Sequence, residues 1–105
     1  MKSKTLKREK KPERLFKIVD KVLRQIFGET ATLSIYNYLE ENHSLTREDV
    51  PNELELFTEG LEKYLSAFGA SVVLRTLFNQ SSRLELTRAE EKNFLKQLKE
   101  LKSLF

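Results

Sequence analysis

Residues that interrupt regular structure are rare in this chain, which has three glycines, two prolines and no cysteine among its 105 residues. Its apolar residues recur at intervals of three and four, the spacing that places them along one side of an α-helix. Leucine, glutamate and lysine, which favour helices over strands, are abundant. A chain of this length buries roughly two-thirds of the surface that it exposes when unfolded. The sequence therefore predicts an all-α fold, a small single-domain bundle of about five helices.

The first half of the chain predicts two helices and a short helical turn. An apolar stripe over 15–27 defines the first helix, and Gly28 is expected to stop it in a left-handed conformation. A second helix is expected over 29–41. A single helical turn is expected at 46–49, and Pro51 closes it because proline disfavours helical geometry in the residue before it.

The clearest apolar stripe covers residues 54–68, and Asn52 is expected to cap the helix that carries it. Gly69 is expected to end this helix. Gly60 lies inside the helix, where glycine costs about 1 kcal/mol relative to alanine. We therefore expect Gly60 to mark a close approach between two helices.

The remaining residues predict two more helices. A short helix is expected over 70–78, followed by a polar turn at 79–82 and a short extended piece at 84–86. Residues 87–90 (Thr-Arg-Ala-Glu) have the pattern of a capping box, in which the first and last side chains each bond the other residue's backbone. The last helix then carries apolar residues between positions 94 and 105.

Charge is strongly segregated along the sequence. Residues 1–27 carry a net charge of +7, residues 28–65 carry −7, and residues 66–105 carry +3. An acidic middle between two basic ends allows the ends to pack on the middle within one chain, or two chains to pair with each other. It is not the pattern of a uniformly basic nucleic-acid binder.

Residues 1–11 are mostly Lys and Arg and are expected to form a basic flexible tail before a helical domain over 12–105. Such residues release counterions from phosphates and bind nucleic acid without sequence preference. Base stacking is not predicted, because no aromatic residue occurs in the first fourteen positions. A solubilising terminus is the favoured interpretation. The candidate nucleic-acid contacts are Lys7, Arg8, Lys10, Lys11 and Arg14, beside a basic face of Lys17, Lys21 and Arg24.

The residue types that carry most enzymatic chemistry are absent or isolated. The lack of cysteine excludes thiolate metal sites and a cysteine nucleophile, and the single histidine, His43, excludes a two-histidine metal motif within one chain. Glu40 and Glu41 beside it would supply only part of a metal site, and we expect His43 to be solvated. The three glycines stand apart, which leaves no phosphate-binding loop. We predict no catalytic, metal or cofactor site, and a protein that is not an enzyme.

No secretory signal or membrane-spanning segment is expected. Charged residues interrupt the stretch 15–27, and the longest uninterrupted apolar run, 72–74, is far below the roughly 20 residues that cross a bilayer. Together with the absence of cysteine, this predicts a cytoplasmic protein.

The last predicted helix is the best candidate for a partner interface, because its apolar residues leave an apolar end on a charged helix. This end either packs on its own bundle, which is the default, or pairs with another chain, including a second copy in a homodimer. The candidate interface residues are Leu95, Leu98, Leu101, Leu104 and Phe105.

About half of the chain carries a recognisable spacing of residues. It consists of Gly28-Glu29, the run 36–41 (Tyr-Asn-Tyr-Leu-Glu-Glu), the run 45–51 (Leu-Thr-Arg-Glu-Asp-Val-Pro), Phe57, Leu61 and Gly69-Ala70. In these residues the chain resembles the small helical archaeal proteins of the Nitrososphaera output domain group, which occur alone or as the last module of signalling proteins. The resemblance implies an all-α fold, an archaeal source and no known catalytic set.

Two functions are therefore expected from the sequence. The first is a non-enzymatic protein–protein interaction module, including a signalling output role. The alternative is non-specific nucleic-acid binding through the basic N-terminal segment. Deletion of residues 1–11 separates them, because it removes nucleic-acid affinity under the second and leaves partner binding intact under the first.

Overall fold

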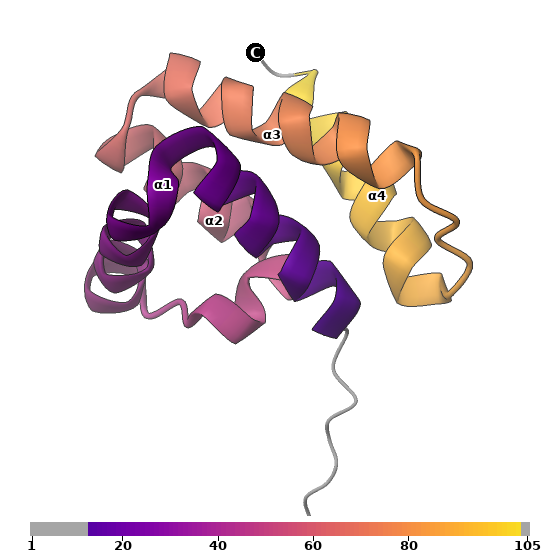
Figure 1. The fold of residues 1–105 in the computed structure, drawn as a ribbon, viewed down its shortest axis with the longest axis horizontal. Helices are drawn as coiled ribbons and strands as arrows, with labels where there is room; N and C mark the ends of the chain where they lie inside the picture. The colour runs from indigo at the N-terminus through magenta and orange to yellow at the C-terminus, as the bar shows by residue number, and fades with distance from the viewer. Residues whose placement is uncertain (1–12, 104–105) are drawn as a thin grey trace, which may run out of the picture.

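The computed structural model describes residues 13–103, and Figure 1 shows a bundle of packed helices. No strand occurs in this part of the chain, so the predicted all-α fold is confirmed. The basic tail 1–11, with its candidate contacts, lies outside the described residues, as do Leu104 and Phe105. The elements are α1 (Glu13–His43), the 3-10 helix η2 (Arg47–Asn52), α2 (Leu54–Tyr64), α3 (Ala67–Ser82) and α4 (Ala89–Lys102).

Helix α1 turns sharply at Gly28, which divides it into a first arm over 13–27 and a second arm over 29–43 (Figure 1). The predicted stop at Gly28 is confirmed in position. Its φ of 86° is positive as expected, but its ψ of 173° is extended rather than left-handed helical. Residues with a Cβ rarely adopt this combination, so the corner depends on glycine. In the first turn of the second arm, the Thr32 hydroxyl donates to the Gly28 carbonyl at 2.7 Å.

Polar and aromatic contacts join the two arms of α1. The Tyr36 hydroxyl donates to the Asp20 carboxylate at 2.7 Å, and the Arg24 Nε donates to the other carboxylate oxygen at 2.9 Å. The Phe16 and Tyr36 rings lie 6.5 Å apart, and the Arg47 guanidinium lies 5.3 Å from the Tyr36 ring centre. Burial and the hydrogen bond to Asp20 raise the pKa of Tyr36, since both favour its neutral form. These contacts fix the angle of the corner.

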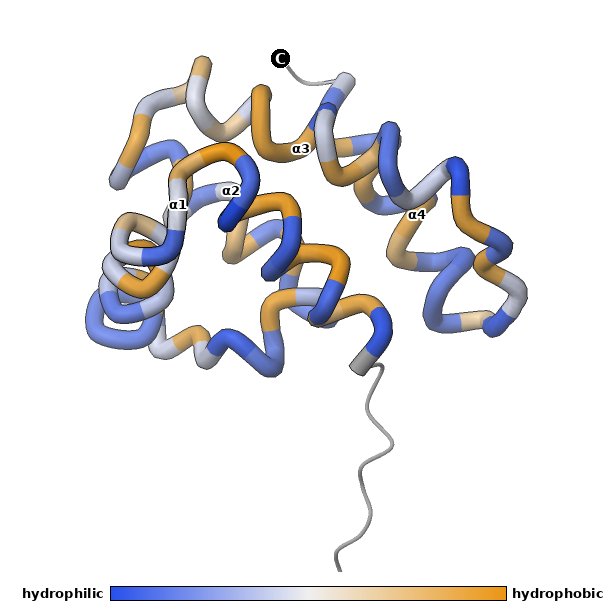
Figure 2. Tube along the Cα trace, viewed as in Figure 1, coloured by the Kyte–Doolittle hydropathy of each residue, from blue (hydrophilic) through white to orange (hydrophobic). Residues whose placement is uncertain are grey.

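The core draws on every helix, and Figure 2 shows apolar positions recurring along each of them. Helices α1, α2 and α3 contact one another, and α4 packs on α3 and α2. The largest fully buried side chains are Phe57, Phe94, Leu15, Leu23, Ile35, Leu39, Leu45, Leu54, Leu61, Leu74, Leu77 and Leu98.

Gly60 marks a close approach between α2 and the second arm of α1, as the sequence predicts. A Cβ placed at Gly60 would overlap the Leu39 Cδ2 and lie 3.3 Å from the His43 Cδ2. The Nε2 atom of His43 is buried in this contact without a hydrogen-bond partner. The predicted solvation of His43 is therefore wrong for this nitrogen, because the backbone of α2 covers it.

The boundary between α2 and α3 differs from the prediction. Helix α2 ends at Tyr64, and α3 begins at Ala67, so Gly69 lies in the first turn of α3 instead of ending the previous helix. The reason is Ser66, whose hydroxyl accepts a hydrogen bond from the Gly69 N–H at 3.1 Å and caps α3. Phe68, predicted as the last residue of a buried stripe, is instead 77% exposed.

Two predicted caps are shifted by one residue. The N-cap of α2 is Glu53, since Asn52 is the last residue of η2. At α4 the Glu91 carboxylate accepts a hydrogen bond from the Arg88 N–H at 3.4 Å, so the reciprocal pair predicted over 87–90 does not start this helix.

The polar turn predicted at 79–82 is the last turn of α3. Ser81 is fully buried there, and the Gln80 amide donates to the Gln25 side-chain oxygen of α1 at 2.8 Å. These tertiary contacts keep a polar sequence helical. Residues 83–88 are non-helical, but the Leu86 N–H donates to the Leu84 carbonyl at 3.1 Å, so the piece predicted as extended at 84–86 forms a tight turn instead.

Candidate functional site

The predicted partner interface on α4 is partly used within the chain. Leu98 is fully buried in the core, and Leu95 and Leu101 are partly buried. The other two candidates, Leu104 and Phe105, lie beyond the described residues. Leu98 is therefore not available to a partner in this structure, because α4 packs this side against α3 and α2.

Two exposed aromatic side chains flank the short connection between α2 and α3. Tyr64 is 42% exposed and Phe68 is 77% exposed, the largest exposed fraction among the large apolar side chains of residues 14–103. The Tyr64 ring rests 4.9 Å from the Tyr38 ring, which in turn lies 5.6 Å from the ring of His43. The Tyr64 ring is thus held in a cluster of tilted aromatic rings, whose other two members, Tyr38 and His43, belong to α1. We call Tyr64 and Phe68 the aromatic turn.

The backbone between these two aromatics is strained. Ser66 has φ 143° and ψ 169°, a region that residues with a Cβ rarely occupy. Such a conformation costs roughly 1–3 kcal/mol and persists only where its surroundings enforce it. A Cβ at Gly69 would lie 2.8 Å from the Leu65 Cβ, so the connection leaves no space for a larger residue there. The aromatic turn therefore holds its shape at the expense of stability.

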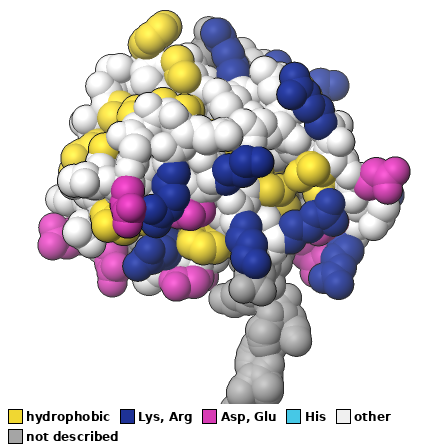
Figure 3. All heavy atoms as spheres, viewed as in Figure 1, with side chains coloured by type: hydrophobic (Ala, Val, Ile, Leu, Met, Phe, Trp, Pro, Cys, Tyr) yellow, Lys and Arg dark blue, Asp and Glu magenta, His cyan; other side chains and the backbone are white. Residues whose placement is uncertain are grey.

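A basic groove runs between the first arm of α1 and the end of α3. Two adjoining hollows share Ile18 and Lys21. One is lined by α1 alone and adds Arg14 and Lys17, and the other brings Lys21 together with Arg83 just after α3. Figure 3 shows Lys and Arg side chains gathered over the middle of this face. We define the basic groove by these four cations, with Ile18 and Leu84 as apolar lining and Gln25 and Gln80 as amide lining.

Two predicted basic residues make ion pairs inside the chain. Arg24 pairs with Asp20 at 2.9 Å and with Glu29 at 3.7 Å. Asp20 raises the pKa of Arg24 through its hydrogen bond and its charge. Arg14 lies 3.7 Å from the buried carboxylate of Glu91, although half of its side chain stays exposed. Of the predicted basic face, Lys17 and Lys21 line the groove, and Arg24 supports the α1 corner.

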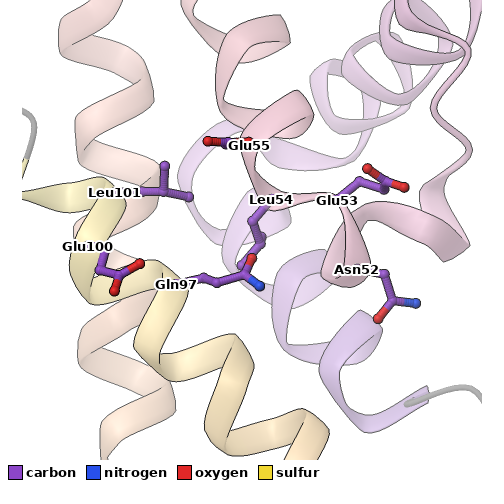
Figure 4. Close-up of a pocket in the computed structure, with 7 residues that line it drawn as sticks. All are labelled: Asn52, Glu53, Leu54, Glu55, Gln97, Glu100 and Leu101. Carbon is purple, nitrogen blue, oxygen red and sulfur yellow. The ribbon is translucent and has the colours of Figure 1, made fainter.

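A third hollow lies between the start of α2 and α4 (Figure 4). It is lined by Asn52, Glu53, Leu54, Glu55, Gln97, Glu100 and Leu101. In the close-up, Glu53 and Glu100 lie on opposite sides of the hollow. Within residues 13–103, no group of three His, Cys, Asp or Glu side chains has the geometry of a metal site, and this holds for His43 with Glu40 and Glu41 as well.

Comparison with known proteins yields no match to a family model, a curated protein or a solved structure. The resemblance to the Nitrososphaera output domain group therefore stays a prediction. None of the helices within the described residues is both long and apolar enough to cross a membrane.

Sequence reasoning missed two features of these surfaces. The sequence does not reveal the aromatic turn, because Phe68 continues the apolar spacing over 54–68 and is therefore assigned to the core. The signal that could have revealed it is Ser66, a residue type that caps helices, three residues before Gly69. Arg83 was not associated with Lys17 and Lys21, because only the packing of α3 on α1 brings them to one groove.

Proposed function

We propose that this protein is a non-enzymatic protein–protein interaction module that docks a partner through its aromatic turn. The observation that carries the proposal is Phe68, which is 77% exposed beside a strained connection. An exposed phenylalanine gains free energy when a partner covers it, and aromatic side chains are common anchors of interfaces. A signalling output role in the cytoplasm of an archaeal cell belongs to the same proposal.

Rigidity of the aromatic turn supports this function. Tyr64 rests on Tyr38, and Ser66 caps the helix whose second residue is Phe68, so the Tyr64 ring and the backbone that carries Phe68 are already ordered before a partner binds. Preorganised anchors lose less conformational entropy on association than flexible ones. Backbone strain also concentrates at binding sites, where the surroundings hold a conformation that the sequence alone does not favour.

The charge around the aromatic turn indicates the chemistry of the partner. Residues 28–65, which include the end of α2, carry a net charge of −7, and the exposed Glu59 and Glu62 outnumber the exposed Lys63 in the last turns before Tyr64. A partner surface that combines an apolar side chain with flanking Lys or Arg complements both features. The proposed partner is therefore a different protein with a basic, apolar docking segment.

The test uses a random peptide library displayed on phage and selected against the full chain. Binding of the enriched peptides is then measured on the wild type, on Phe68→Ala and on the control Leu84→Ala. Leu84 is also a large exposed apolar residue, but it lies outside the aromatic turn. We expect Phe68→Ala to weaken binding at least about tenfold, because truncation of an anchor residue costs about 2 kcal/mol or more and about 1.4 kcal/mol corresponds to tenfold. Leu84→Ala should leave the affinity unchanged.

Two results would contradict the proposal. One is a set of enriched peptides that bind Phe68→Ala as tightly as the wild type, and the other is enrichment of acidic rather than basic peptides. Sedimentation of the wild type measures its oligomeric state. A dimer that Phe68→Ala dissociates would show that a second copy of the chain, and not a different protein, covers Phe68. Because Phe68 is exposed, its truncation leaves the core intact and a loss of binding cannot be attributed to unfolding.

A further inference from the structure

The basic groove has no role in the proposed docking function, which uses a different part of the molecule. We infer that the groove binds the phosphate backbone of a nucleic acid. Its walls come from the first arm of α1 on one side and from the end of α3 with the following residues on the other. The site therefore exists only in the folded chain.

Three of the four groove cations are free to bind a ligand. Lys17, Lys21 and Arg83 are exposed, and no described carboxylate forms an ion pair with them. Arg14 shares its charge with Glu91 at 3.7 Å. The acidic side chain closest in sequence on the first arm, Asp20, is already bonded to Arg24 and Tyr36. The groove is thus a local excess of positive charge.

The spacing of the cations suits a polyanion. Lys17 and Lys21 are one helical turn apart on α1, which separates them by about 6 Å along the helix. Phosphates on one strand of a duplex follow one another every 3.4 Å along its axis, so the two ammonium groups can reach phosphates close together on a strand. Arg83 adds a planar donor from the opposite wall, suited to bidentate contact with a phosphate.

The lining favours a nucleic acid over a membrane surface. The apolar lining consists of Ile18, which is only 8% exposed, and Leu84, which is 42% exposed at one end of the groove; a single exposed leucine is too little apolar surface for insertion into a bilayer. Gln25 and Gln80 come from opposite walls, where the Gln80 amide donates to the Gln25 side-chain oxygen at 2.8 Å, and their remaining amide N–H groups can bond phosphate or sugar oxygens. No aromatic side chain lines either hollow, and base stacking is therefore not expected. The groove should bind without sequence preference.

The experiment measures binding of a fluorescently labelled random-sequence DNA duplex to the full chain by anisotropy over a series of salt concentrations. The groove variant carries Lys17→Gln, Lys21→Gln and Arg83→Gln. A matched control carries Lys63→Gln, Lys96→Gln and Lys99→Gln, which remove the same charge from exposed positions outside the groove. A tail variant replaces Lys7, Arg8, Lys10 and Lys11 with Gln, and it measures the predicted contribution of the N-terminal segment separately.

We expect the wild type to bind with a slope of log K against log salt of about −3, from three to four neutralised phosphates. The groove variant should lose more than tenfold in affinity at low salt, and its slope should become shallower by roughly one for each contact removed. The matched control should retain most of the affinity. The thermal midpoints of all variants should agree, because every substituted residue that the structure describes is exposed.

Three results would overturn the inference. In the first, the matched control loses as much affinity as the groove variant, which indicates a response to net charge alone. In the second, only the tail variant loses binding. In the third, the wild type fails to bind the duplex and binds phosphatidylserine vesicles through the groove. None of these results bears on the peptide experiment at Phe68, so the two proposals can fail independently.

Discussion

Two corners of the molecule have similar backbone torsion angles. Gly28 turns α1 back on itself at φ 86° and ψ 173°, and Ser66 joins α2 to α3 at φ 143° and ψ 169°. Both conformations lie in a region that is essentially restricted to glycine. At Gly28 the residue adopts the conformation without strain, whereas at Ser66 the surroundings must enforce it. The strained backbone at Ser66 lies next to Phe68, the most exposed aromatic residue within 14–103.

The forces that hold the two corners also differ. The corner at Gly28 is closed by the hydrogen bond from Tyr36 to Asp20, and nothing lies within 4 Å of a Cβ built at this glycine. The corner at Ser66 is closed locally, by its cap on Gly69 and by the tight contact of Gly69 with Leu65. A side chain at Gly28 would therefore meet no neighbouring atom, whereas a side chain at Gly69, next to the second corner, would collide with Leu65. Three substitutions test this contrast.

The largest effect is expected for Gly28→Ala. The new methyl group meets no neighbour, so the full effect comes from a backbone conformation that alanine disfavours. We expect the free energy of unfolding to fall by about 2 kcal/mol, measured by urea denaturation. Ser34→Ala, at an exposed position of the second arm, serves as the control and should change stability little. A fall below about 0.5 kcal/mol, the size of an ordinary surface substitution, would show that the corner tolerates a Cβ.

A smaller effect is expected for Tyr36→Phe, which removes the hydrogen bond to Asp20 and keeps the ring. The loss should be about 1.5 kcal/mol near neutral pH, because a hydrogen bond to a charged group is stronger than a neutral one. The effect also depends on pH. The raised pKa of Tyr36 in the folded state means that its contribution is complete below about pH 10 and is lost as the pH rises further.

Urea unfolding of the wild type and Tyr36→Phe at several alkaline pH values checks this dependence. The difference between the two proteins should narrow above about pH 10. If the difference in the free energy of unfolding stays constant up to strongly alkaline pH, the raised pKa of Tyr36 is contradicted. The lower stability of Tyr36→Phe would then come from altered packing. Tyr64→Phe, which alters an exposed tyrosine, is the matched control for loss of a hydroxyl group and should change the free energy of unfolding little near neutral pH.

The smallest effect, and the only stabilising one, is expected for Ser66→Gly. Glycine relieves a strain of roughly 1–3 kcal/mol, but it loses the cap on α3 and gains freedom in the unfolded chain. The net result should be about 0.5 kcal/mol of added stability, visible as a raised thermal midpoint. If the variant is less stable than the wild type, the cap outweighs the strain, and the two corners are more alike than their residues suggest.

The sequence was sufficient to predict the all-α fold, the corner at Gly28 and the close approach at Gly60. These follow from local spacing and from the special properties of glycine. It was insufficient at the end of α2, because Phe68 continues an uninterrupted apolar spacing and nothing local shows that Ser66 will hold a strained conformation. It was also insufficient at 79–82, where burial of Ser81 extends the helix through residues that resemble a turn.

The candidate sites were predictable only where a single helix carries them. Lys17 and Lys21 lie on one face of α1, and their spacing predicts this. Arg83 joins them through tertiary packing, which a single sequence does not show. Leu98 illustrates the opposite error, since an apolar residue on a charged helix has the same pattern whether the core or a partner covers it.

The corner in α1 has a consequence for the order in which the chain folds. Asp20 and Tyr36 are 16 residues apart, whereas Gln25 and Gln80, which join α1 to α3, are 55 residues apart. Because loop-closure entropy grows with the logarithm of loop length, the shorter closure is favoured by about 1 kcal/mol. The two arms of α1 can therefore meet before α3 arrives, and they give the chain a local nucleus on which the later helices condense.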